Sequence, residues 1–218
     1  MGRNELIKSI FVDQDVSGYS GREVLDCVLS SDTRQICSVI FRYHAELPKV
    51  TTNSIPQFSN SEDVFSVIKI VKESPEPDLN WGKIGFYLCP RESNLSAKVK
   101  YGENHYKLAV QLGLAVEKKI ELTDFGEEVY RNVDSIDHEV LLGKLSLRIP
   151  LIQQALLNAT FGRFNLLAYM ETLLAPVTAL RRRSNVKRLL SYLAIANKDQ
   201  KLQDNLWNIV WENEDEFS

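Results

Sequence analysis

Apolar side chains in this chain recur with the period of an α-helix, and each such run is short. Ile36, Val39, Ile40 and Tyr43 occupy positions i, i+3, i+4 and i+7, which places them along one helix face. The run at residues 61–74 has a similar pattern, with acidic residues in its first turn, where the helix dipole favours them. Turn residues separate these runs, so the chain is predicted to fold mainly from short packed helices.

The predicted order of secondary-structure elements is most informative about the fold in the middle of the chain. Helices are predicted at residues 61–74, 81–88 and 102–115, with an irregular stretch at 89–101. The next segment, VEKKIELT (116–123), predicts two short strands joined at a Lys-Lys turn, and another helix follows it. Three helices followed by a tight β-ribbon is the order of a winged helix.

The C-terminal part has a related layout, which predicts a second winged-helix unit. A helix over residues 137–158 is expected to break near Pro150, and a short helix over 164–174 follows it. A basic helix is predicted over 177–196, with Pro176 at its start, where the missing N–H matters little. The stretch NKDQKLQDNLWNIVW then forms either a small wing or a closing element.

The N-terminal part has no such layout. Residues 4–16 fit either a strand or a short helix, residues 20–31 fit a helix, and residues 47–61 are a polar linker with two prolines. The helix after Ser31 or Asp32 has Gln35 at the capping-box position. We therefore expect a mainly α protein with tandem winged helix-turn-helix units carrying small β-wings. Its three regions are a helical N-terminal segment (1–58), a first winged-helix domain (59–134) and a second winged-helix domain (135–218).

Composition is that of a globular protein. The 218 residues are 44% hydrophobic, enough for one large or two small cores, and no apolar run has the length that spans a bilayer. Charges near the start do not fit a signal peptide. Three cysteines without a C-x-x-C spacing favour a reducing compartment over a disulfide or zinc framework. We expect a cytoplasmic protein with no membrane partner.

Charge is unevenly distributed along the chain. The net charge is −3, yet residues 176–201 hold seven basic residues and one acidic residue, so this segment carries +6 and the rest −9. A basic surface on an acidic protein indicates a polyanionic partner. The alternative is a solvated helix face whose arginines pair with Glu171 or with the acidic tail.

The basic helix is predicted to have one apolar face and one basic face. At about 100° per residue, its apolar residues fall together, and Arg182 and Arg183 flank them. A basic face with arginine and amide side chains suits the major groove, where arginine donates to guanine edges. The apolar face comprises Ala179, Val186, Leu189, Leu190 and Leu193, and the basic face comprises Arg181, Ser184, Asn185, Lys187 and Arg188.

The segment TALRRRSNVKRLLSYL resembles the second winged-helix segment of DNA-binding modules in restriction–modification proteins. That segment has Thr, a gap, Arg-Arg, a small residue, a polar residue and Val, and residues 178–186 match this order. Residues 61–128 are similar to the first winged helix of the same modules, with QLGL at 111–114 and a Leu-Thr-x-x-Gly ribbon end at 122–126. The resemblance covers about residues 60–197 and implies sequence-specific binding of double-stranded DNA in a restriction or phage-defence system.

The first recognition helix departs from this pattern. The family has an Arg-Gln pair and two tyrosines where this chain has residues 101–106, YGENHY, and its basic residues are Lys98, Lys100 and Lys107. The alternative role for the first unit is packing or dimerisation, whereas the second unit keeps the pattern expected for DNA contact. The Lys-Lys turn is expected to bind backbone phosphates. The predicted DNA-binding residues are Thr178, Arg181, Arg182, Arg183, Ser184, Asn185, Lys187, Arg188, Lys118, Lys119, Lys98, Lys100, Asn104 and His105.

Two other functions stay open on the sequence. A Mg²⁺-dependent endonuclease would need carboxylates and a lysine, and Pro77-Asp78 with Glu117-Lys118-Lys119 is a formal match. We discount it because Asp78 lies in a proline-containing turn and Glu117 at a wing tip. The N-terminal part holds further candidate carboxylates for such an enzyme, namely Asp13, Asp15, Glu23 and Asp26. The other possibility is a winged-helix adaptor that docks an acidic protein.

No cofactor or metal ligand set is predicted. The three histidines, His44, His105 and His138, have no metal-ligand spacing, and no phosphate-binding glycine loop is present in the sequence. Trp81 is expected in the core of the first unit. The expected partners are double-stranded DNA and either a nuclease subunit, which would carry out cleavage, or a second copy of the chain.

Overall fold

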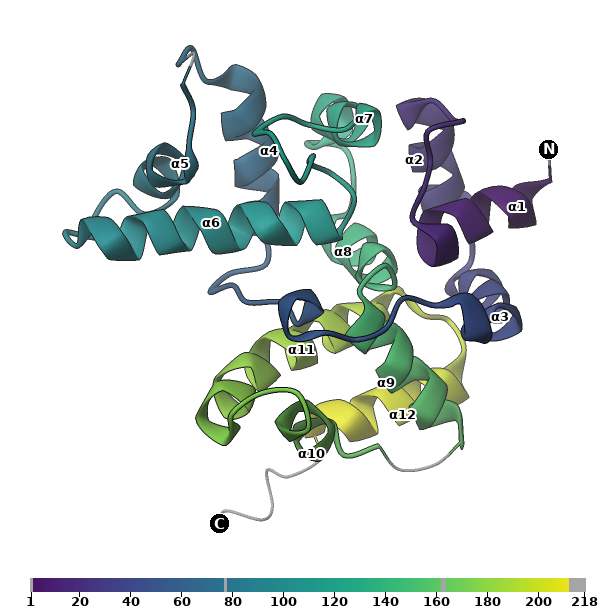
Figure 1. Cartoon of the computed structure of the whole chain (residues 1–218). Helices are drawn as coiled ribbons and strands as arrows, with labels where there is room; N and C mark the ends of the chain where they lie inside the picture. The colour runs from purple at the N-terminus through teal and green to yellow at the C-terminus, as the bar shows by residue number, and fades with distance from the viewer. Residues whose placement is uncertain (1, 77, 162–163, 212–218) are drawn as a thin grey trace.

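The computed structural model describes residues 2–76, 78–161 and 164–211, and within them the regular structure is helical (Figure 1). No β-strand forms in these ranges, and the only pairing is an isolated antiparallel bridge between Ala115 and Leu122. The mainly α prediction is therefore confirmed. The helices are α1 (Arg3–Lys8), α2 (Gly21–Ser30), α3 (Thr33–Arg42), α4 (Asp63–Glu73), α5 (Trp81–Leu88), α6 (Leu95–Gln111), α7 (Asp124–Asn132), α8 (His138–Ser146), α9 (Pro150–Phe161), α10 (Leu166–Glu171), α11 (Pro176–Ala196) and α12 (Gln200–Trp211).

Side-chain caps fix where most of these helices begin. Ser20 and Glu23 form a complete capping box at the start of α2. Asp32 caps α3 through the backbone N–H of Arg34, but the predicted box with Gln35 does not form, because the Gln35 amide donates to Asn4 instead. Side-chain oxygens of Asn80, Asn94, Thr123, Asp137 and Asn165 cap α5, α6, α7, α8 and α10.

Helices α4, α5 and α6 lie together at one end of the molecule (Figure 1). Helix α6 begins at Leu95 rather than at residue 102, because Asn94 caps it and residues 95–101 contain no helix breaker. Gly85 and Gly102 let α5 and α6 meet backbone to backbone: a Cβ on either would lie about 2 Å from a carbonyl oxygen of the other helix. This contact sets Trp81, the first residue of α5, beside α6.

The segment after α6 makes a hairpin without strands. Leu114 and Thr123 pair at its base and Val116 and Glu121 further along, with N···O distances of 3.1 and 3.0 Å. Tyr106 of α6 lies inside the hairpin, where its hydroxyl donates to the Val116 carbonyl at 2.8 Å and accepts from the Glu121 N–H at 3.2 Å. The two strands predicted here do not form, and a single bridge and a turn take their place. The buried side chain of Tyr106 holds this hairpin against α6.

The C-terminal part is helical throughout the residues described. Helices α8 and α9 meet at Pro150 with an 81° bend, as the proline predicts. Residues 200–211, for which a wing was one possibility, form helix α12, so no wing forms between α11 and residue 211. Its repeated apolar residues, Leu202, Leu206 and Ile209, have helical spacing and pack into the core. The tandem winged-helix order is therefore not observed.

One hydrophobic cluster extends through all three predicted regions. Helices α1 and α3 pack on each other, α2 lies on α7, and α11 lies on α8 and α12 (Figure 1). Lys144 of α8 is buried and donates from Nζ to the Val28 and Leu29 carbonyls at 3.0 and 2.8 Å, which satisfies the end of α2. No single described helix has both the length and the apolar composition to cross a membrane, although the bent α8–α9 pair reaches both together.

Candidate nucleic-acid interface

The apolar face predicted for the basic helix is confirmed. All five of its predicted residues on α11 are 0% exposed, and they pack with α8, α10 and α12. The helix therefore lies at the centre of the C-terminal part, and only a strip along it faces solvent. This strip decides which of the predicted DNA-binding residues a nucleic acid can reach.

The polar residues of α11 divide into exposed and packed groups. Arg181, Ser184 and Arg188 are exposed, and their i, i+3, i+7 spacing puts them on one outward strip. Thr178, Arg183, Asn185 and Lys187 are half-buried, as is Arg182. Val177 and Leu180 share the outward strip and are 82% and 54% exposed. The accessible positive charge of α11 therefore centres on two arginines.

Arg182 is committed to a contact inside the molecule. Its Nη1 donates to the Thr52 and Ile55 carbonyls, each at 3.2 Å. Burial, with a smaller effect from Arg181, lowers the pKa of Arg182. From the other side, the Gln111 amide of α6 donates to the Asn53 carbonyl at 3.3 Å. The linker is thus held between α6 and α11, and the prediction of Arg182 as a direct DNA contact is not supported by this geometry.

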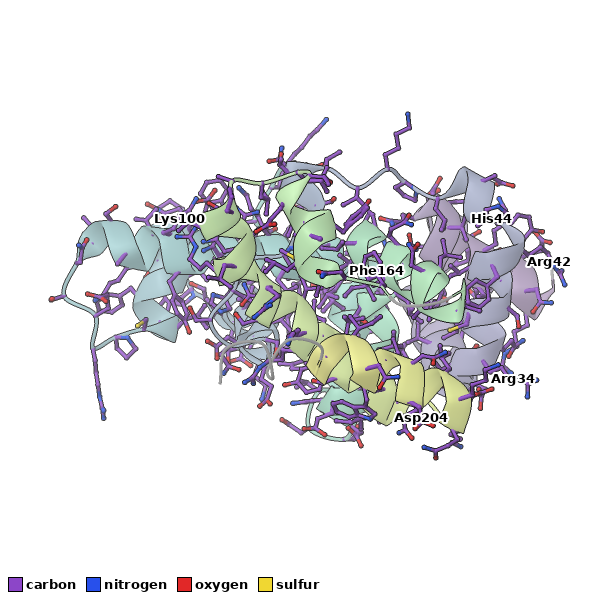
Figure 2. All side chains as sticks on the ribbon, turned by 90° about the horizontal axis from the view of Figure 1, so that it is seen from below. Arg34, Arg42, His44, Lys100, Phe164 and Asp204 are labelled. Atoms are coloured by element: carbon purple, nitrogen blue, oxygen red, sulfur yellow. The ribbon has the colours of Figure 1, made fainter. Side chains whose placement is uncertain are left out.

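A polar strip on α6 faces the same linker. Lys100, Asn104, Lys107 and Gln111 have i, i+4, i+7, i+11 spacing, which aligns them on one face. With Arg182, they line a groove of about 320 Å³. Figure 2 shows Lys100 at one end of the molecule, with Arg34 and Arg42 at the opposite end. Other groove residues are Thr52, Asn53, Ile55, Gln57, Trp81, Tyr106, Leu108, Val110 and Glu117.

Glu103 reduces the charge of this strip. It lies between two lysines, with Oε2 2.8 Å from Lys100 Nζ and Oε1 2.6 Å from Lys107 Nζ, and its side chain is 14% exposed. These lysines lower the pKa of Glu103, so it stays ionised near neutral pH. Lys107 also lies over the Trp81 ring, 5.6 Å from its centroid. The strip therefore exposes the ammonium groups of its lysines, and the carboxylate of Glu103 beneath them holds both in place.

Two predicted DNA contacts on α6, Lys98 and His105, are not supported by this geometry, because their side chains are buried. Lys98 is 9% exposed, and its ammonium lies 4.5 Å from the centroid of Phe86. His105 is 0% exposed: Nδ1 donates to the Tyr101 carbonyl at 2.8 Å, and Nε2 accepts from the backbone N–H groups of residues 59 and 60 at 3.4 Å. Both residues lie on the buried face of α6. The prediction rested on their side-chain chemistry, which is typical of DNA contacts, and not on their position around the helix.

His105 joins the linker to α6 as a neutral ring. Burial lowers its pKa, and this outweighs smaller opposing effects from the Tyr101 carbonyl and Asp63. Tyr101 stacks on it with ring centroids 4.2 Å apart and donates to Asp63 at 2.7 Å. The same network therefore fixes the end of the linker, the start of α4 and the middle of α6.

Lys118 and Lys119 lie at the exposed tip of the hairpin, as predicted. The Lys119 side chain is 73% exposed and pairs loosely with Glu121, at 3.8 Å. Because Tyr106 holds the hairpin backbone from inside, the lysines are presented from a fixed turn beside α6. Trp81, expected in the core, is 38% exposed and lines the groove described above.

The formal nuclease match is not assembled among the residues described; Pro77 lies outside them. Asp78 pairs with Lys83 at 2.5 Å, and Glu76 pairs with the same lysine and accepts from Tyr87. Glu117 is on the hairpin, beside the groove. Over residues 2–76, 78–161 and 164–211, no group of three or more His, Cys, Asp or Glu residues could hold a metal ion.

The N-terminal carboxylates each have a structural partner. Asp13 pairs with Lys8 at 2.8 Å, Asp15 accepts from the Ser17 N–H at 3.0 Å, and Asp26 pairs with Arg22 at 3.0 Å. Glu23 belongs to the capping box of α2. Asp13 ends a short helical segment after α1, Asp15 lies in the following loop, and Glu23 and Asp26 lie on α2, and each carboxylate is occupied by its own structural partner.

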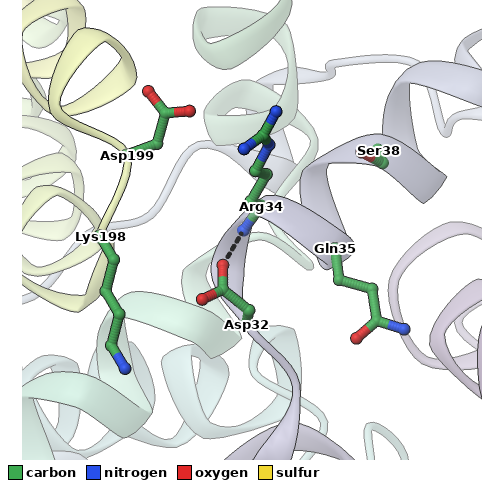
Figure 3. Close-up of a pocket in the computed structure, with 6 residues that line it drawn as sticks. All are labelled: Asp32, Arg34, Gln35, Ser38, Lys198 and Asp199. Atoms are coloured by element: carbon green, nitrogen blue, oxygen red, sulfur yellow. Dashed lines mark hydrogen bonds between the residues drawn. The ribbon is translucent and has the colours of Figure 1, made fainter.

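Another cavity, of about 440 Å³, lies between the start of α3 and the loop before α12 (Figure 3). The carboxylate of Asp32 accepts from the Arg34 N–H at 2.8 Å, and that of Asp199 accepts from the Leu202 N–H at 3.1 Å. Arg34 and Lys198 balance these two charges around the cavity. The carboxylates are occupied as helix caps, so the cavity has no net charge to attract a polyanion.

Trp81, Lys107 and Gln111 line the groove and are not among the predicted DNA-binding residues. The helical spacing of Lys107 and Gln111 from Lys100 was the signal that could have found them. Comparison with known proteins adds no guide to this site, because no family model, curated protein or solved structure matches the chain.

Proposed function

We propose that this protein binds double-stranded DNA through a composite surface made by α6, the 115–122 hairpin and the outward strip of α11. One observation carries the proposal: the polar strip of α6 lines a groove with Arg182 of α11, and the hairpin lysines line an adjoining cleft that shares Trp81 and Tyr106 with this groove. In an acidic chain, this gathering of cations from three distant segments is the pattern that phosphate binding requires.

Each segment has a distinct role in the proposed complex. The α4–α5–α6 unit with its hairpin is proposed as a winged helix, with Lys100, Asn104 and Lys107 of α6 reading base edges or phosphates. Lys118 and Lys119 bind phosphates at the hairpin tip. Arg181 and Arg188 extend the contact along α11. This places more of the recognition on the first unit than the sequence pattern predicted.

The resemblance to restriction–modification modules supports a place in a restriction or phage-defence system, with cleavage by a separate nuclease subunit. The adaptor alternative rests on Val177 and Leu180, which are the most exposed apolar residues of α11 and lie beside Arg181. An acidic protein docked on this strip would compete with DNA there. The two proposals differ in the ligand, so direct binding measurements separate them.

The test is the affinity for a pool of random duplexes, measured by fluorescence anisotropy with and without Mg²⁺, followed by selection and sequencing. The double variant Lys118→Gln/Lys119→Gln is expected to weaken binding and to lower the slope of log K against log salt by about 1 per lysine. Arg181→Gln/Arg188→Gln should have the same effect. The matched control is Arg34→Gln/Arg42→Gln, which removes the same charge at the opposite end of the molecule (Figure 2).

Equal losses in the control and in both test variants would show that only net charge matters, and the proposed surface would be wrong. Absence of duplex binding at low salt would remove the proposal and leave the adaptor. Cleaved DNA in the Mg²⁺ sample would make the chain an enzyme. An enriched motif with intact DNA is the expected outcome.

A further inference from the structure

A second cleft adjoins the groove and shares Trp81 with it. Its volume is about 340 Å³, at the low end of the range that binds small molecules. Trp81 and Gly82 of α5, Val99 of α6 and Ile120 of the hairpin give it mainly apolar walls. Trp81, Tyr106 and Glu117 line both cavities, and Trp81 is 38% exposed.

Positive charge lies only at the rim of this cleft. Lys118 and Lys119 lie on its hairpin side, and Lys107 lies over the Trp81 ring from the groove side. The acidic groups here are Glu117, which also lines the cleft, and Glu121, which pairs with Lys119 at 3.8 Å. A flat apolar group with an attached anion would match these walls and this rim.

We propose that the cleft binds an unpaired nucleobase, which stacks on Trp81 while Lys118 and Lys119 bind the adjoining phosphate. A base has a π-face for the indole, and stacking of this kind tolerates any sequence. The inference deepens the proposed function, since DNA is the ligand in both, but it concerns an unpaired base rather than the duplex.

Two sets of contacts hold the walls of the cleft in place before any ligand binds. Tyr106 fixes the hairpin from inside, because its one hydroxyl proton is shared between the carbonyls of Val116 and Lys119, whose oxygens lie 2.8 and 2.5 Å from the hydroxyl oxygen. The close contact of Gly85 and Gly102 fixes α5 on α6. A slot that is rigid before binding loses less entropy on binding a ligand.

The experiment uses the full chain with Trp207→Phe and Trp211→Phe, so that Trp81 is the only tryptophan. A short oligothymidylate is expected to quench Trp81 fluorescence saturably. An abasic oligomer of equal length and charge should bind more weakly and leave the fluorescence unchanged. Equal binding and no quenching by either oligomer would overturn the inference. Equal competition by polyglutamate would also overturn it, in favour of an acidic peptide.

Variants of the otherwise wild-type chain test the residues. Trp81→Leu should weaken oligothymidylate binding by about 5- to 150-fold, the effect of losing one base–aromatic stack. Val99→Phe, which fills the cleft from α6, should weaken it while Trp81 stays in place. Phe86→Leu is the matched control, because Phe86 is an exposed aromatic residue of the same helix outside the cleft, and it should leave binding unchanged.

Photocrosslinking supplies a measurement that needs no substitution. Oligonucleotides carrying 5-iododeoxyuridine should crosslink wild-type protein at Trp81, identified by mass spectrometry, and a crosslink confined to other peptides would overturn the inference. Its failure is distinguishable from failure of the proposed function. Duplex binding without quenching removes only the base site, whereas quenching without duplex binding removes only the duplex surface.

Discussion

Gly113 is the residue whose substitution tests most directly how the hairpin is attached to the rest of the fold. It has φ = +80° and ends α6 with the bonds Gly113 N–H to Val110 and Leu114 N–H to Ala109, the pattern of a Schellman motif. A Cβ at this position would lie 2.8 Å from the guanidinium carbon of Arg148. Gly113→Ala therefore meets both a backbone penalty and a steric one.

The magnitude follows from these two contributions. A left-handed backbone destabilises alanine by about 1–2 kcal/mol. Arg148 is 7% exposed, with Nη1 donating to the Ile10 carbonyl at 2.6 Å, so it cannot move aside without breaking that bond. A hydrogen bond to a charged group contributes about 1.5–3 kcal/mol. Together these two contributions predict that Gly113→Ala lowers the free energy of unfolding by roughly 2.5–5 kcal/mol. For a chain of this size, this corresponds to a decrease in Tm of roughly 5–20 °C.

The assay is thermal and urea unfolding followed by circular dichroism, arranged as a double-mutant cycle with Arg148→Met. In the Arg148→Met background, Gly113→Ala should lower stability by the backbone part alone, about 1–2 kcal/mol. Equal losses in both backgrounds would refute the contact between Gly113 and Arg148. A loss below about 1 kcal/mol in the wild-type background would refute the strain argument as well.

Three further substitutions test single contacts. Because folding favours the neutral ring of His105, its stabilising contribution is complete above the unfolded pKa of about 6.5 and is lost as pH falls towards the lower folded pKa. His105→Gln should therefore flatten the decrease in Tm on acidification, and parallel curves would contradict this. Lys144→Met leaves two α2 carbonyls unpaired and should lower the unfolding free energy by about 1–3 kcal/mol, measured in urea. Glu103→Gln releases Lys100 and Lys107 and should tighten duplex binding with a steeper salt slope; weaker binding would contradict the proposed strip.

Local signals in the sequence were sufficient for most helices. The bounds of α5 follow from the turn residues before Trp81, and α7 begins after the predicted Thr123. The break at Pro150 and the start of α11 at Pro176 depend on proline geometry alone. Such features need only neighbouring residues, and so they can be predicted before any tertiary contact is known.

The hairpin and α12 show where local signals were insufficient. Alternation of apolar and polar residues predicted strands in VEKKIELT, but two isolated strands without a third have little intrinsic stability. Here the Tyr106 hydroxyl forms hydrogen bonds with hairpin carbonyls that would have paired between strands in a longer β-ladder. For residues 200–211, packing against α9 and α11 selects the helix, and that packing is not visible in the segment itself.

The candidate site was predicted in part, because charge is easy to see in a sequence and burial is not. The helical periodicity of α11 predicted its apolar face correctly. It did not predict that Arg182 donates to the linker carbonyls of Thr52 and Ile55. That contact joins residues about 130 positions apart, and no local pattern predicts it. Since Gln111 binds the same linker from α6, the two basic helices share one structural element. We therefore expect a ligand that moves either helix to act on the other through residues 52–55.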